Sequence, residues 1–160
     1  MIKRNFIDRS KETIMALYKS LVRPHLEYCI PVWNPYLINH IKLLERVHRR
    51  STKLVQLIEK WQYDERLQYL GLTQLDTRRV RSDLVETFKI MNGIYDVSRE
   101  SLFELDVGDR RGHDQKLFKR HFRLNLRKFV FSNRVVNSWN LQSAQCVNSY
   151  TINTLKICFS

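Results

Sequence analysis

The spacing of apolar residues near the N-terminus predicts two short helices. Between Ser10 and Val22, apolar side chains recur every three or four positions, and the Ser10 hydroxyl is placed to cap the first amides. Pro24 cannot continue that helix without a kink, but it suits the first turn of a new one. A second helix is therefore expected from His25 to Trp33.

The same spacing predicts three further helices. The longest should run from about Ile38 to Lys60 and bury a stripe near Ile41, Leu44, Val55 and Ile58. A short helix over Tyr63 to Leu70 has two acids at its start and Gly71 available as a left-handed cap. A helix from Gln74 to Met91 is stopped by Asn92-Gly93. Its apolar side comprises Val80, Leu84, Val85, Phe88 and Met91.

Beyond Gly93 the pattern changes. Apolar and polar residues alternate from Phe122 to Arg127, which predicts an extended segment or short strand that buries Phe122, Leu124 and Leu126. Ser132 is placed to cap a short helix that carries Val135, Val136 and Trp139, and Tyr150 to Phe159 has a weaker helical pattern. The expected fold is mainly α. It has a helical domain at 1–95, a linker at 96–109 and a basic, partly extended segment with short terminal helices at 110–160.

Charge and composition narrow the class of partner. The chain has 28 Lys and Arg against 16 Asp and Glu, a formal net charge of +12, which suits a polyanion such as nucleic acid. No apolar run is long enough to span a membrane, and the N-terminus lacks the apolar centre of a secretory signal, so an intracellular protein is expected, nuclear or cytoplasmic. Three widely spaced cysteines fit reduced, buried thiols.

Two groups of cations are candidate nucleic-acid contacts. Lys42, Arg46, Arg49 and Lys53 are separated by four, three and four residues, so they form a row on one helix face with Arg50 beside it. A solvated surface face is the alternative, although Glu45 and Glu59 supply few counter-charges. Arg78, Arg79 and Arg81 are weaker candidates because they are expected to pair with Asp76, Asp83 and Glu86.

The second group lies between Arg110 and Trp139, where nine Lys or Arg accompany one acid and several Phe residues. The rings could stack on bases or anchor the segment to a core, and anchoring is favoured for Phe118, Phe122 and Trp139. The cations then remain as the expected contact groups. They are Lys119, Arg120, Arg123, Arg127 and Lys128.

Catalytic and metal-binding patterns are absent from the sequence. The histidines and cysteines show no metal-ligand spacing, and neither a nucleophile elbow nor a phosphate-binding glycine loop occurs. Carboxylates that could in principle hold Mg²⁺ form a minor alternative: Glu100, Glu104, Asp106 and Asp109. No cofactor is expected in this chain.

Three stretches closely resemble a known family. They are ALYKSLVRPHLEYCIPVWNPY with LLERVHRRSTKL, then ERLQYLGLTQLDTRRVRSDLVETFKIMNG, then RGHDQKLFKRHFRLNLRKFVFSNRVVNSWN. In this order they resemble the region downstream of the palm in jockey-like non-LTR (LINE-type) retrotransposon reverse transcriptases, from about Lys3 to Lys156. The family's catalytic Tyr-x-Asp-Asp turn, which binds Mg²⁺, lies upstream and does not occur in this chain.

The resemblance implies a thumb-like fragment of an RNA-directed DNA polymerase that does not catalyse on its own. It also implies partners: RNA and DNA as template and primer, and the palm, with Mg²⁺ expected only there. Both cation groups would then contact nucleic-acid backbone without base specificity. An intracellular protein-interaction module or a non-functional relic of a mobile element is the alternative, and self-association through exposed apolar surface is possible in either case.

Overall fold

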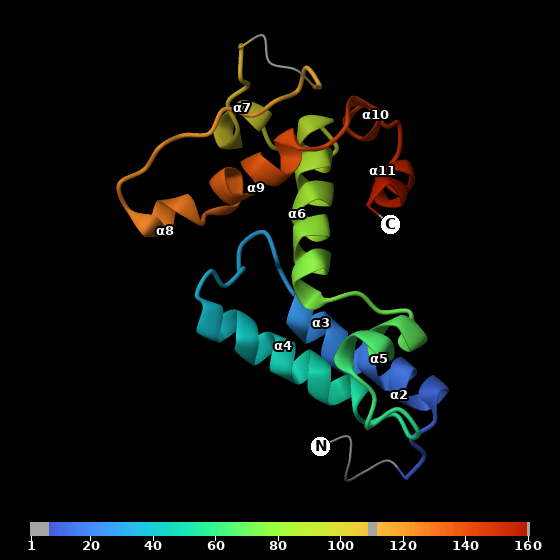
Figure 1. Cartoon of the computed structure of the whole chain (residues 1–160). Helices are drawn as coiled ribbons and strands as arrows, with labels where there is room; N and C mark the ends of the chain where they lie inside the picture. The colour runs from blue at the N-terminus through green and yellow to red at the C-terminus, as the bar shows by residue number, and fades with distance from the viewer. Residues whose placement is uncertain (1–6, 109–111, 160) are drawn as a thin grey trace. The chain divides into compact units, whose positions relative to one another are not determined.

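The computed structural model describes residues 7–108 and 112–159 and is mainly helical, as predicted (Figure 1). Among these residues, strand-like pairing is limited to one isolated antiparallel bridge between Leu105 and Leu117. The chain divides into two compact units. The first unit contains the residues up to 29 together with 33–78, and the second contains 30–32 and the residues from 79 onward.

The first unit begins with a helix that accommodates a proline. α2 (Lys11–Leu17) continues directly into the π-helical turn η1 (Tyr18–Val22) and then into α3 (Arg23–Glu27). The Ser10 side chain accepts a hydrogen bond from the Thr13 amide at 3.4 Å, so the predicted cap is confirmed. Pro24 lies in the first turn of α3, where its missing N–H costs little, and the wide π turn before it relieves the clash of its ring with the preceding turn.

The predicted helix from His25 to Trp33 is wrong in its extent. α3 ends at Glu27, Tyr28 is extended, and Cys29 has a left-handed backbone with φ of 49°. The side chain of Cys29 is exposed, as is that of Cys158, so the predicted burial of the cysteines is also wrong. All three thiols are free.

α4 (Ile38–Thr52) is shorter than the helix predicted from Ile38 to Lys60. The Gln56 amide, which would bond to the Thr52 carbonyl in a longer helix, instead donates to the Arg9 carbonyl at 3.0 Å. Leu57 then takes a left-handed backbone with φ of 72°. Val55 and Ile58 are buried as predicted, but they lie in the turns after α4. The longest helix described is α6, with 17 residues.

The next two helices match their predictions closely. α5 (Tyr63–Leu70) begins with a reciprocal cap between Gln62 and Glu65 and ends at Gly71, whose φ of 63° is left-handed. α6 (Leu75–Met91) begins in the first unit and continues into the second, and Gly93 follows it with φ of 65°.

The core of the first unit is formed by side chains of α2, η1, α3, α5, α6 and the turns after α4. It contains Ile14, Tyr18, Leu26, Val55, Ile58, Leu70 and Leu75.

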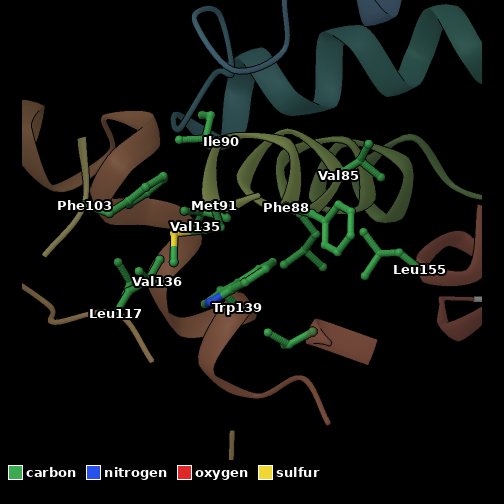
Figure 2. Close-up of a cluster of buried hydrophobic side chains, with 12 residues drawn as sticks. Val85, Phe88, Ile90, Met91, Phe103, Leu117, Val135, Val136, Trp139 and Leu155 are labelled. Atoms are coloured by element: carbon green, nitrogen blue, oxygen red, sulfur yellow. The ribbon is translucent and has the colours of Figure 1, made fainter. Parts of the chain in front are cut away.

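The core of the second unit is built by α6 and α9 (Phe131–Asn140). Figure 2 shows side chains of α6, such as Phe88 and Met91, pointing toward Trp139 of α9, which is fully buried. Val135 and Val136 are buried on the predicted short helix, whereas Val80, which the pattern placed on the apolar side of α6, is 44% exposed. The predicted Ser132 cap is wrong, because the N-cap position is Val130, which lacks a side-chain hydrogen bond.

α9 fixes the path of the chain that precedes the second cation group. The Trp139 indole donates to the Gln115 carbonyl at 2.8 Å. The Asn140 side chain accepts from the backbone N–H of Leu117 at 2.9 Å and donates to its carbonyl at 2.8 Å.

The residues predicted as a linker, 96–109, contain α7 (Arg99–Leu102) and the buried Phe103 and are described up to 108. They lie within the second unit, because the two units divide after Arg78.

The extended segment or short strand predicted from Phe122 to Arg127 is wrong in its second half and in its burial. Residues 125–128 form the short helix α8 (Asn125–Lys128), and Phe122, Leu124 and Leu126 are 36, 67 and 69% exposed. An extended segment needs a neighbouring strand to pair its amides and carbonyls, and the described residues supply none here. The chain ends with α10 (Ala144–Val147) and α11 (Ile152–Cys158), the latter within the predicted helical stretch.

Candidate nucleic-acid interface

The cations predicted for the third helix lie on one face of α4. At about 100° per residue, they fall within an arc of roughly 100°. Lys53 follows the last helical residue but keeps a helical backbone, with φ of −75° and ψ of −9°. We call this surface the α4 basic face. All of its members are exposed: Lys42, Arg46, Arg49, Arg50 and Lys53.

The α4 basic face keeps its positive charge because nearby acids are engaged elsewhere. Among the described residues, no member of the face takes part in an ion pair. Glu45 accepts a hydrogen bond from the Tyr63 hydroxyl, and Glu59 pairs with Arg9 at 3.2 Å. These are the two carboxylates that the sequence places nearest to the row. The arginine and lysine side chains are therefore available to an external anion.

A buried polar chain supports the other side of α4. His48 is fully buried and stacks on the Tyr18 ring, with 5.4 Å between ring centroids. Its Nδ1 lies 3.0 Å from the Tyr63 hydroxyl, which donates to Glu45. Since that hydroxyl proton goes to the carboxylate, Nδ1 of His48 is the donor toward Tyr63. The chain of hydrogen bonds runs from His48 through Tyr63 to Glu45.

Burial sets the protonation of this chain. Burial raises the pKa of Tyr63, and the hydrogen bond to Glu45 raises it further, so the hydroxyl keeps its proton. Burial lowers the pKa of His48, although the Glu45 carboxylate opposes that shift, so the imidazole is neutral at pH 7. The Arg49 guanidinium lies over the Tyr63 ring, 4.3 Å from its centroid. The ring therefore contacts a member of the α4 basic face.

Sequence reasoning did not identify His48 or Tyr63 as supports. The only local signal is the three-residue separation between Glu45 and His48, which puts both on adjacent turns of α4. Tyr63 lies in α5, fifteen positions after His48, and no local pattern predicts that α5 folds back onto α4 at this point.

The second cation group lies on an irregular part of the second unit, residues 118–128, which we call the 118–128 segment. Lys119 donates to the Asn137 side chain at 3.0 Å, and Arg120 pairs with Glu104 at 3.1 Å. The Arg127 guanidinium lies 6.0 Å from the centroid of the Phe122 ring. All the predicted contact residues are exposed: Lys119, Arg120, Arg123, Arg127 and Lys128. Arg110 and Arg111 lie outside the described residues.

Other cations of the chain support the fold. Arg134 forms two bonds with Asp83, at 2.9 and 2.8 Å, and donates to the Ile30 carbonyl at 2.9 Å. Such a bidentate, half-buried guanidinium is a structural crosslink within the second unit. It cannot also bind an external phosphate without breaking these bonds.

Two arginines of α6, Arg78 and Arg81, are also engaged, but not with the partners that the sequence predicted. Arg78 pairs with Glu27 and donates to the Tyr18 hydroxyl at 2.9 Å. Arg81 donates to the Phe159 carbonyl. Their predicted partners Asp83 and Glu86 bind Arg134 and Lys89 instead. Arg78 and Arg81 therefore do not pair locally, whereas Glu86 does, because its partner Lys89 lies on the same helix.

The acids proposed as a minor magnesium alternative do not form a cluster in the described residues, where no group of three or more metal-ligating side chains occurs. Glu100 bonds Ser98 and Arg99, and these hydrogen bonds lower its pKa to about 2. Glu104 pairs with Arg120. Asp109 lies outside the described residues.

Comparison with family models, curated proteins and solved structures found no match for the chain. Across residues 7–108 and 112–159, no helix combines the length and the apolar character needed to cross a bilayer.

Proposed function

We propose that the chain is a thumb and post-palm region of a jockey-like non-LTR retrotransposon reverse transcriptase, and that it holds template and primer by their phosphate backbones. The α4 basic face is the observation that carries this proposal. In this role the chain contributes binding and not chemistry, and a palm with its Mg²⁺-binding aspartates supplies catalysis.

The geometry of α4 suits a phosphate backbone. From Lys42 to Lys53 the helix rises about 16 Å at 1.5 Å per residue. A strand of duplex advances about 3.4 Å per nucleotide, so the face is long enough to lie along roughly five phosphates. Lysine and arginine side chains reach phosphates without reading base edges. The expected binding is therefore independent of sequence.

Fluorescence anisotropy with a labelled RNA–DNA hybrid at several salt concentrations tests the proposal. If about six of the cations in the two groups contact phosphates, the logarithm of affinity should fall against the logarithm of salt with a slope of about −4 to −5. Absence of binding at low salt, or binding that salt does not weaken, would contradict the proposal.

A protein-interaction module is the second candidate, and exposed apolar side chains of the first unit favour it. Tyr28, Trp33 and Leu57 are 77, 54 and 93% exposed. Such residues cost little singly, but together they give a partner or a second copy apolar surface to bury. Light scattering across a concentration series tests self-association. A monomer at all concentrations that also binds the hybrid favours the nucleic-acid role.

A further inference from the structure

We propose that the 118–128 segment binds single-stranded nucleic acid, with bases stacked on Phe118 and Phe122 and phosphates on the neighbouring cations. This inference rests on the proposed function and deepens it by assigning the two cation groups to different forms of nucleic acid. The α4 basic face binds backbone of either form, whereas the 118–128 segment adds a stacking contact that only unpaired bases can make.

The rings of Phe118 and Phe122 are both exposed to solvent. Phe118 is 43% exposed and Phe122 is 36% exposed, although the sequence favoured both as core anchors. Phe131, by contrast, packs against the buried Phe103 with 5.8 Å between ring centroids. Exposed rings between cations are the arrangement that single-strand-binding proteins use, since every base has a face that can stack.

The backbone that carries Phe118 is held in place by hydrogen bonds. Its amide donates to the Glu104 carbonyl at 2.7 Å, and the adjacent Leu117 is 1% exposed and bridges Leu105. The Asn140 side chain bonds both backbone groups of Leu117. The ring of Phe118 therefore extends from a backbone that is already ordered, so a stacked base loses little affinity to ordering of the protein.

The cations beside the rings are available to bind phosphates. Arg120 pairs with Glu104 at 3.1 Å, but the two side chains are 62 and 51% exposed, and exposed pairs are weak. A phosphate can therefore replace that carboxylate at low cost. Arg123 has no ion pair among the described residues, and the Arg127 guanidinium lies over the Phe122 ring. Cations are thus available between the two rings and after them along the segment.

A small cavity lies at the same place in the second unit. Its volume is about 240 Å³, and its lining includes Arg120 of the segment and Glu104, whose carbonyl holds Phe118. Met91, Phe103 and Leu105 supply the apolar part of the lining. The volume is below the range of pockets that hold drug-sized ligands, so it suits one planar ring and not a longer segment. Arg120, two residues after Phe118, is the residue of the segment that borders this space.

A strand that keeps its phosphates but lacks its bases separates stacking from charge. Anisotropy should be measured with a short single-stranded oligodeoxynucleotide, with an abasic strand of the same length, and with the RNA–DNA hybrid. The wild-type chain should bind the base-bearing strand at least about 5-fold more tightly than the abasic strand. The variant Phe118→Ala with Phe122→Ala should lose this preference and keep its affinity for the hybrid.

Leu124→Ala with Leu126→Ala is the matched control, because these side chains are also apolar and exposed in the same segment but have no ring. This control should keep the full preference for bases. Equal affinity of the wild type for base-bearing and abasic strands overturns the inference while leaving the proposed function intact, and would point to a protein ligand for the rings. Retention of the preference in the phenylalanine variant also overturns it. Failure to bind any of the three probes at low salt overturns the proposed function itself.

Discussion

The two cation groups differ in how the fold presents them. On α4, regular helical geometry holds five cations on one exposed face, and a buried chain from His48 to Glu45 supports the opposite side. In the 118–128 segment, cations of similar number lie on mostly irregular backbone between exposed apolar side chains. Similar charge densities in the sequence therefore correspond to different surfaces.

This difference bears on what each surface can recognise. The α4 helix fixes the spacing of its cations, so the α4 basic face suits the regular repeat of phosphates. Irregular backbone with rings between the charges suits a flexible strand with accessible bases. Charge alone predicts a polyanion for both, and only the surroundings of the charges distinguish the two partners.

The largest effect is expected from reversing charges in one group at a time. Arg46→Glu with Arg49→Glu should weaken hybrid binding roughly 50- to 100-fold near 0.1 M salt and reduce the salt slope by about two. Arg123→Glu with Arg127→Glu should weaken single-strand binding more than hybrid binding. Anisotropy with both probes measures these changes.

Lys19→Glu with Lys60→Glu is the control for net charge, since both lysines are exposed in the first unit outside the α4 basic face. It changes the formal charge by the same amount and should have a much smaller effect. An equal loss of affinity in this control would mean that the total field of the protein, and not contact at α4, drives binding.

A smaller effect is expected from removing the support beneath α4. Tyr63→Phe keeps the ring beneath Arg49 but deletes the hydroxyl that joins His48 to Glu45. The free energy of unfolding should fall by about 1–3 kcal/mol, because buried polar groups lose their partner. Urea denaturation measures the loss. Tyr69→Phe, at a 47% exposed tyrosine of the same helix, should cost less than about 0.5 kcal/mol, and equal costs for the two variants would exclude the buried chain as the cause.

The smallest effect is a dependence of stability on pH. Burial lowers the pKa of His48 below its usual 6.5 in the folded state, so the unfolded chain binds the extra proton first. The contribution of this group to stability is complete above pH 6.5 and is lost as pH falls toward the folded pKa. The loss should approach, at most, about 1.4 kcal/mol per pH unit.

Urea denaturation between about pH 7.5 and 5.5 measures this slope. His40→Gln should keep the slope because His40 is exposed on α4, whereas His48→Gln should lose most of it. A slope that survives in His48→Gln would assign the pH dependence to other groups and would remove His48 as the sensitive site.

Several features follow from short stretches of sequence. The bounds of α5 and the end of α6 were predictable because Gly71 and Gly93 supply left-handed backbone within a few residues of each helix end. The α4 basic face was predictable because the helical period alone fixes which cations share a side. These signals are local, so they act in the same way whatever the rest of the chain does.

Other features depended on residues far apart in the chain. α4 ends early because the Arg9 carbonyl takes the Gln56 amide, and beyond Phe118 the 118–128 segment is not a strand because no strand among the described residues pairs with it. Arg134, one of the nine cations between Arg110 and Trp139, is held by Asp83 and the Ile30 carbonyl, and both lie far from it in the chain. The sequence by itself determined the helical class, the positive charge and the order of its cation groups. Only the tertiary structure decided which cations and rings stay exposed, because exposure depends on competition among distant hydrogen-bond and packing partners that no local pattern encodes.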